Sequence, residues 1–138
     1  KSMNLTDYLN EYAKRSYQPV SPDLSVKHLK QFMFLSREFL TIFSPTTLYV
    51  DVPFYHFSNP QKGIASIDYI FQNHGRDILL VQIQASKVVS QHGKYLKKIK
   101  RNKQSLLRAH HYLQEHFDIP EIYEILFRKK SQTLEFLF

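Results

Sequence analysis

Two short apolar runs followed by a strongly cationic segment constrain the fold of this chain more than any other feature. The runs Ile64–Phe71 and Ile78–Ile83 each have about the length of a β-strand, and the polar residues Gln72–Arg76 join them. We therefore expect a β-hairpin. The segment that follows, Lys87–Arg108, carries eight Lys or Arg residues and no acid. A hairpin beside a cationic helix would suit the recognition of a phosphate backbone.

Three polar side chains are expected to meet near the ends of this hairpin. Successive side chains of a strand point to opposite faces, so Asp68 shares a face with Ile70 on the first strand. On the second strand, Gln82 and Gln84 share a face with Leu80 by the same rule. In the simplest register, an acid and two amides therefore emerge from neighbouring strands.

Charge and composition narrow the class of protein and partner. The formal net charge is +7, and no acid interrupts the sequence between Asp77 and Glu115. Such clustering favours a polyanionic partner, because an ordinary soluble surface intersperses the two signs. The hydrophobic content of 43% provides enough apolar surface to offset the ordering entropy of a fold, so a disordered chain is not expected.

The 138 residues predict a single domain, 1–138, with residues 1–20 as an N-terminal helix appended to the core. The absence of cysteine excludes disulfides and is typical of the cytoplasm or another reducing compartment, including the nucleus or the cytosol of a host cell. No apolar run approaches the roughly 20 residues of a membrane span, so no membrane partner is expected. A start at Lys1 is consistent with a piece of a larger chain or protein complex.

The remaining elements follow from periodicity and from breaks in it. Prolines and polar residues interrupt the pattern at Gln18–Asp23 and at the predicted turn Ser58–Gly63. We expect an α/β (α+β) fold of order ααβββαββ, in which a central mixed sheet of about five strands is flanked by helices. The predicted helices are Leu5–Tyr17, Leu24–Phe43 and Lys94–His116, and the strands outside the hairpin are Thr46–Phe57, Glu121–Phe127 and Thr133–Phe138.

Acids and amides in this order suggest metal-dependent hydrolysis of a phosphodiester. That reaction needs a divalent metal ion to neutralise developing charge and to acidify a water molecule, and Mg²⁺ is held by a few carboxylate or carbonyl oxygens. A cation beside the metal would steady the attacking hydroxide or the transition state. In this chain Glu38, Asp68 and the segment 82–84 are the candidates.

The order of elements, together with the pair SIDYIF and LLVQIQ, resembles the PD-(D/E)XK restriction-endonuclease-like superfamily across roughly residues 24–127. The resemblance implies an endonuclease fold with Mg²⁺ or Mn²⁺ as cofactor and DNA or RNA as substrate. Asp68 matches the metal-binding Asp of the family, Gln82 its second acid, Gln84 its lysine and Glu38 its helix acid. Asp68, Gln82 and Glu38 are accordingly the expected metal ligands.

Two positions depart from the family pattern, and they leave two interpretations open. An amide oxygen at Gln82 can still ligate a metal, whereas an uncharged Gln84 cannot stabilise hydroxide as an ammonium group would. Lys87 or Lys94 would have to supply that charge from a neighbouring element. The chain is then either an active endonuclease or a catalytically inactive module with the same fold, which binds nucleic acid or an acidic protein partner through its basic helix.

The basic helix is the expected nucleic-acid-binding surface in both interpretations. Its cations would contact phosphates rather than read bases. Among the seven histidines, His92 precedes this helix and is the best candidate for a phosphate contact or proton relay. The predicted contacts are His92, Lys94, Lys97, Lys98, Arg101 and Lys103.

Overall fold

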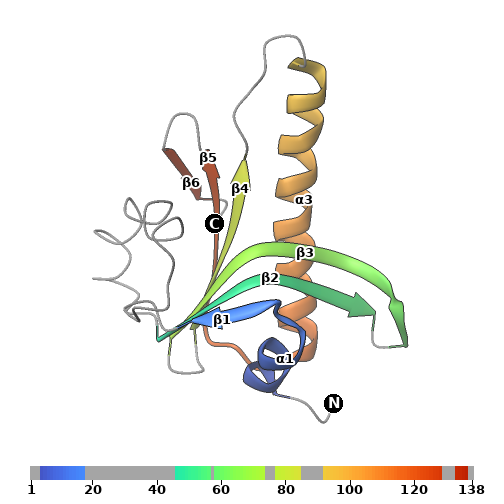
Figure 1. The fold of residues 1–138 in the computed structure, drawn as a ribbon, viewed down its shortest axis with the longest axis vertical. Coiled ribbons are helices and arrows are strands. Elements are labelled where there is room, and N and C mark those ends of the chain that lie inside the picture. The colour runs from blue at the N-terminus through green and yellow to red at the C-terminus, as the bar shows by residue number, and fades with distance from the viewer. Residues whose placement is uncertain are drawn as a thin grey trace.

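A computed structural model describes residues 4–17, 46–56, 58–73, 77–84, 92–128 and 133–136 of the chain. The described helices are α1 and α3, and the described strands form one six-stranded sheet in the order β1-β2-β3-β4-β5-β6 (Figure 1). The elements are α1 (Leu5–Tyr12), β1 (Arg15–Tyr17), β2 (Thr47–His56), β3 (Asn59–Asn73), β4 (Asp77–Gln84), α3 (His92–His116), β5 (Ile122–Arg128) and β6 (Thr133–Phe136).

The sheet is mixed, as expected for an α+β fold. All neighbouring strands are antiparallel except β4 and β5, which are parallel. Parallel neighbours require a crossover connection, and α3 lies between these two strands in the sequence. The five predicted strands are all present, and so are the first and last predicted helices. The predicted helix Leu24–Phe43 and the linker Gln18–Asp23 lie outside the described residues.

The prediction of one helix over Leu5–Tyr17 was wrong in its second half. The helix ends at Tyr12, and Arg15–Tyr17 forms the short strand β1 against β2. The backbone N–H of Lys14 donates to the carbonyl of Val50 at 2.9 Å, which starts this pairing. Pairing with a distant strand outweighs local helix periodicity here, because it satisfies backbone groups along an otherwise unpaired strand edge.

The predicted turn Ser58–Gly63 was also wrong in extent. Strand β3 begins at Asn59, and the register places His56 opposite Asn59 and Tyr55 opposite Gly63. Two register shifts around Tyr55 absorb the extra residues as a bulge or similar irregularity. The polar segment is therefore the outer end of a long β2–β3 hairpin.

Half-way along this long hairpin, a different set of alternate residues begins to face the core. In the first half of β2, Tyr49 faces the larger core, whereas in the second half Val52 and Phe54 do. These positions differ in parity, so the alternation shifts by one residue between them. Asp51 lies at the shift and has a left-handed φ of 52°, which is uncommon outside glycine. The hairpin curves away from β4 and β5 beyond this region (Figure 1).

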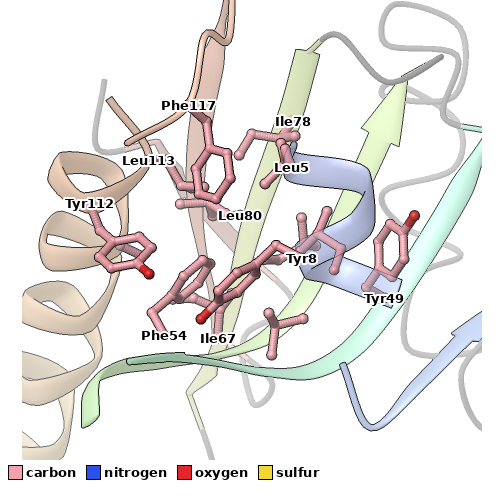
Figure 2. Packing of buried hydrophobic residues seen from close by; sticks show 14 of the residues in the cluster. Leu5, Tyr8, Tyr49, Phe54, Ile67, Ile78, Leu80, Tyr112, Leu113 and Phe117 are labelled. Atoms are coloured by element: carbon pink, nitrogen blue, oxygen red, sulfur yellow. The ribbon is translucent and has the colours of Figure 1, made fainter. Parts of the chain in front are cut away.

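The two described helices and one face of the sheet pack around the same hydrophobic core. Tyr8 of α1 stacks on Phe54 of β2 with ring centroids 5.6 Å apart, and Tyr112 of α3 lies 5.2 Å from Phe54 (Figure 2). The hydroxyl of Tyr8 donates to the carbonyl of Pro53 at 2.9 Å and accepts from the N–H of Tyr55 at 3.3 Å. The aromatic contacts and these hydrogen bonds hold α1 on the curved part of β2.

At the other end of the hairpin, buried polar side chains fix the position of α1 on the sheet. Gln72 of β3 is 2% exposed. Its Oε1 accepts from the hydroxyl of Tyr49 at 3.1 Å, and its Nε2 donates to the hydroxyl of Thr6 at 3.1 Å. Such pairing avoids the cost of a buried unsatisfied amide. The opposite face of the sheet has its own buried cluster, consisting of Leu48, Val50, Tyr69, Phe71, Leu79, Val81 and Ile125.

Neither helix in the described part of the chain has the length and apolar character that a membrane span requires.

Replacing Tyr8 with Phe tests the attachment of α1 to the sheet. The change keeps the stacking on Phe54 but removes the partner of the Pro53 carbonyl and of the Tyr55 N–H. We expect Tyr8→Phe to lower the free energy of unfolding by about 1 to 3 kcal/mol, measured by urea denaturation. Tyr12→Phe, at an exposed ring, is the matched control and should stay within about 0.5 kcal/mol of the original chain. Equal stability of all three proteins would contradict this attachment.

Candidate functional site

The side chains of Asp68 and Gln82 each bond to the backbone of the neighbouring strand where β3 separates from β4. The backbone ladder between these strands ends at the pair Tyr69 and Val81. Beyond it, the N–H of Ile83 donates to Asp68 Oδ2 at 2.8 Å, and the N–H of Asp68 donates to Gln82 Oε1 at 2.8 Å. Side-chain atoms thus take the place of ladder hydrogen bonds at the point where the sheet forks.

Gln82 completes this connection with its other amide atom. Its Nε2 donates to the carbonyl of Ser66 at 2.9 Å, and its side chain is buried, with the residue 5% exposed. Both ends of the amide are therefore engaged with the backbone of β3. These bonds give Gln82, an expected metal ligand, a structural role in joining β4 to β3.

Gln84 lies apart from this pair. It is 1% exposed, and its Oε1 accepts from Asn102 Nδ2 of α3 at 2.7 Å. The predicted shared face of Gln82 and Gln84 is consistent with these contacts, but the two amides have different partners. Gln84 anchors the helix to the sheet, whereas Gln82 joins the two strands.

Asp51 is a second carboxylate, and it lies beside Asp68. On β2 it lies between Val50, paired with Tyr69, and Val52, paired with Ile67, so the same register places it opposite Asp68. Asp51 is exposed, and its left-handed backbone sits at the alternation shift described above. Left-handed backbone in a non-glycine residue stores strain that is characteristic of functional sites. A lone acid within the apolar run Leu48–Phe54 was the available signal.

The electrostatics of Asp68 connect this row of residues to α3. Burial raises the pKa of Asp68, the N–H of Ile83 opposes that rise, the carboxylate of Asp51 adds to it, and the ammonium of Lys98 opposes it. The pKa of Asp68 thus responds to charges on β2 and on α3 at the same time. Asp68 thus interacts electrostatically with both Asp51 and Lys98.

The cationic face of α3 is exposed where its side chains are described. Lys97, Lys98, Lys100 and Arg101 are exposed and Lys103 is half-buried. On the inner side of the same helix, Leu106, Ala109 and Leu113 are fully buried in the core. The helix is therefore amphipathic. One side packs on the core, and the cations on the other side face solvent. A groove of about 390 Å³ on this helix is lined by Ile99, Lys100, Lys103, Gln104 and Leu107.

Several predicted site residues are not placed by the structure. Glu38 and Lys87 lie outside the described residues. His92 and Lys94 belong to the first turn of α3, which therefore begins two residues before the predicted start, but their side chains are outside the described set. Within the described ranges, no group of three or more His, Cys, Asp or Glu side chains is arranged to hold a metal ion.

A buried acid on β5 and a half-buried imidazole on α3 form a contact that the sequence did not predict. Glu124 of β5 is fully buried, and burial raises its pKa to about 7. His110 of α3 contacts it through Nδ1 and Oε1, and burial together with the charge of His111 lowers the pKa of His110. The two shifts favour a neutral pair, in which the proton that imidazole holds in the unfolded chain resides on the carboxyl group after folding.

Comparisons of this chain with models of protein families, with curated proteins and with solved structures find no match.

Single substitutions in the His110–Glu124 pair should reveal opposite dependences of stability on pH. In the intact pair, the proton lost by His110 is gained by Glu124, so the number of bound protons changes little between about pH 4.5 and 6.5 on folding. In His110→Asn the folded chain binds the extra proton of Glu124, so the free energy of unfolding should fall as pH rises from about 4.5 to about 7. In Glu124→Gln the lowered pKa of His110 remains, so stability should fall as pH drops below about 6.5.

Urea denaturation of the three proteins across this pH range measures both slopes. His56→Asn, at an exposed residue of the β2–β3 hairpin, is the control for loss of an imidazole. Parallel stability curves for the original chain and both pair variants would show that the proton is not transferred within the pair.

Proposed function

We propose that this chain is a nucleic-acid-binding, metal-dependent phosphodiesterase (endonuclease) domain of the PD-(D/E)XK type, acting on DNA or RNA. One observation carries the proposal. Asp68 lies at the fork between β3 and β4, in register with Asp51, and its pKa responds to Lys98 on the cationic helix. A row of two acids beside a cationic surface is suited to holding a divalent metal ion against a phosphate group.

The donor set fits Mg²⁺ or Mn²⁺. Mg²⁺ is usually held by one or two carboxylates and keeps several waters or substrate oxygens. Asp51 is exposed, and the hydrogen bond from the N–H of Ile83 engages Oδ2 of Asp68. In this proposal Asp68 is the principal ligand and Asp51 the second, with Glu38 as a further candidate. Gln82 orients Asp68 through the backbone of β3. When bound, the metal ion supplies Lewis acidity towards the phosphate and acidifies a water molecule.

We assign to Lys98 the role of the family's lysine, whose positive charge is missing at Gln84. Its ammonium already offsets part of the cost of an ionised Asp68. A lysine on an exposed helix face beside the acids can stabilise the negative charge that develops on a phosphate in the transition state. The assignment replaces Lys87 and Lys94 in this role, and Gln84 then only anchors α3 through Asn102.

Substitution of Asp68 tests the catalytic proposal. Asp68→Asn keeps an oxygen that can accept from the N–H of Ile83 but removes the charge that would bind the metal. We expect cleavage of DNA or RNA with Mg²⁺ or Mn²⁺ to fall by at least about a hundredfold, the size typical of removing an electrostatic contribution to catalysis. Asp118→Asn, at an exposed acid after α3, is the matched control and should cleave normally. Unchanged cleavage by Asp68→Asn would contradict the assignment of Asp68 as the principal metal ligand.

Neutralising the helix cations tests the binding surface separately. The double substitution Lys97→Gln and Arg101→Gln should weaken binding at all sequences and reduce the slope of log affinity against log salt by about 1 for each phosphate that is no longer neutralised. Lys14→Gln with Lys62→Gln removes the same charge from exposed positions of the sheet side and serves as the control. Fluorescence anisotropy across a salt series measures both effects. Equal losses of affinity in the two double variants would mean that binding depends only on net charge.

A nucleic-acid-binding module without nuclease activity is the second candidate. The observation that favours it is the commitment of Gln82 and Gln84 to internal hydrogen bonds, where an active member of the family would present a second acid and a lysine. This candidate predicts salt-sensitive binding through α3 with no metal-dependent cleavage by the original chain. The two experiments above therefore separate the candidates.

A further inference from the structure

A second cavity with ionisable walls lies away from the fork of the sheet. Its volume is about 380 Å³, within the range of small-ligand sites. Arg108 in its wall follows Lys98 by ten residues, or about 15 Å along α3 at 1.5 Å per residue. The walls come from the outer end of the β2–β3 hairpin and the last turns of α3: His56, Ser58, Ile64, Arg108, His111, Tyr112, Glu115 and His116.

The lining combines one cation with three imidazoles. Arg108 carries a fixed positive charge and is exposed, and His56, His111 and His116 supply imidazole nitrogens that can hydrogen-bond to an anion. Glu115 is the acid among these lining residues, and its Oε2 lies 3.8 Å from His116 Nε2. The wall therefore offers one cation and several N–H donors to an anion.

The hydrogen-bonding groups suit a tetrahedral anion. His56 Nδ1 and the Ser58 hydroxyl lie 2.7 Å apart, so these two groups are held together at the hairpin side of the cavity. From the helix side, a guanidinium group can donate two parallel hydrogen bonds to phosphate oxygens. Donors therefore approach from two different elements, as a group with oxygens in several directions requires.

Apolar side chains form the remaining wall and strengthen these interactions. Tyr112 is buried, and its ring centroid lies 4.8 Å from that of His116. Ile64 of β3 is half-buried on the hairpin side. Ring and aliphatic surfaces exclude water, and attraction between opposite charges increases as the local dielectric falls.

We propose that this cavity binds a phosphate monoester dianion through Arg108, His56, His111, His116 and Ser58. The terminal phosphate of a nucleic-acid strand and that of a free nucleotide share this chemistry. The site is independent of Asp68 and requires neither a metal ion nor cleavage, so it goes beyond the function proposed above.

Sulfate is the first probe, because it is a tetrahedral dianion. We expect titration of the whole chain with sulfate at constant ionic strength to shift the imidazole NMR signals of His56, His111 and His116. Absence of a response at these three rings, with chloride as the reference anion, would overturn the proposal.

Two variants with opposite effects separate binding from unfolding. Arg108→Gln should weaken sulfate binding at least about tenfold, since the fixed charge is removed. Glu115→Gln should tighten binding at least about twofold, an increase that a destabilised fold does not produce. Arg101→Gln, which removes a charge from the proposed nucleic-acid face of the same helix, should bind sulfate as the original chain does. Identical affinities for Arg108→Gln and the original chain would contradict the site.

Phosphorylated ligands then identify the source of the monoester. The probes are an oligonucleotide with a terminal phosphate, the same oligonucleotide with a terminal hydroxyl, and a nucleoside monophosphate. Tighter Arg108-dependent binding of the phosphorylated oligonucleotide assigns the cavity to strand ends. Equal Arg108-dependent binding of the monophosphate and the phosphorylated oligonucleotide assigns it to a small phosphorylated ligand. Failure of the terminal phosphate to improve binding of either ligand class would overturn the monoester assignment.

Discussion

The exchange of hydrogen bonds between Asp68 and the strand β4 determines the shape of this molecule. A regular ladder would continue past Tyr69 and Val81, but here the side chains of Asp68 and Gln82 supply the missing partners. Backbone groups at a fork in a sheet would otherwise lose partners in a partly buried position, which is costly. Because these side chains satisfy the N–H groups of Asp68 and Ile83 and the carbonyl of Ser66, the β2–β3 hairpin can leave the sheet without leaving these groups unpaired.

The fork in turn positions both proposed sites. On its inner side, the hairpin places Phe54 and Ile67 over the core that α1 and α3 share. Its pairing places Asp51 in register with Asp68 near the middle, and its outer end brings His56 and Ser58 to the last turns of α3. The same hairpin thus contributes to an acidic row near its middle and to the cavity with Arg108 at its end.

The periodicity of the sequence was sufficient to predict the hairpin and the cationic helix face, because each depends on residues close in sequence. The period of two predicted a common cluster of Asp68, Gln82 and Gln84, but Gln84 bonds to α3 instead. Strand β1, the long start of β3 and the left-handed Asp51 were not predicted, because β1 pairs with a distant strand and the other two follow from irregular pairing between β2 and β3. The same holds for the buried contact between His110 and Glu124.

The central claim is that the acids at the fork hold a divalent metal ion, and paramagnetic broadening by Mn²⁺ tests it without depending on turnover. Titration of the whole chain with Mn²⁺ should broaden the backbone amide signals of Asp51, Asp68 and Ile83 first, and Asp68→Asn should abolish this selectivity. Broadening that begins elsewhere in the chain, or that is the same in Asp68→Asn, would contradict the account.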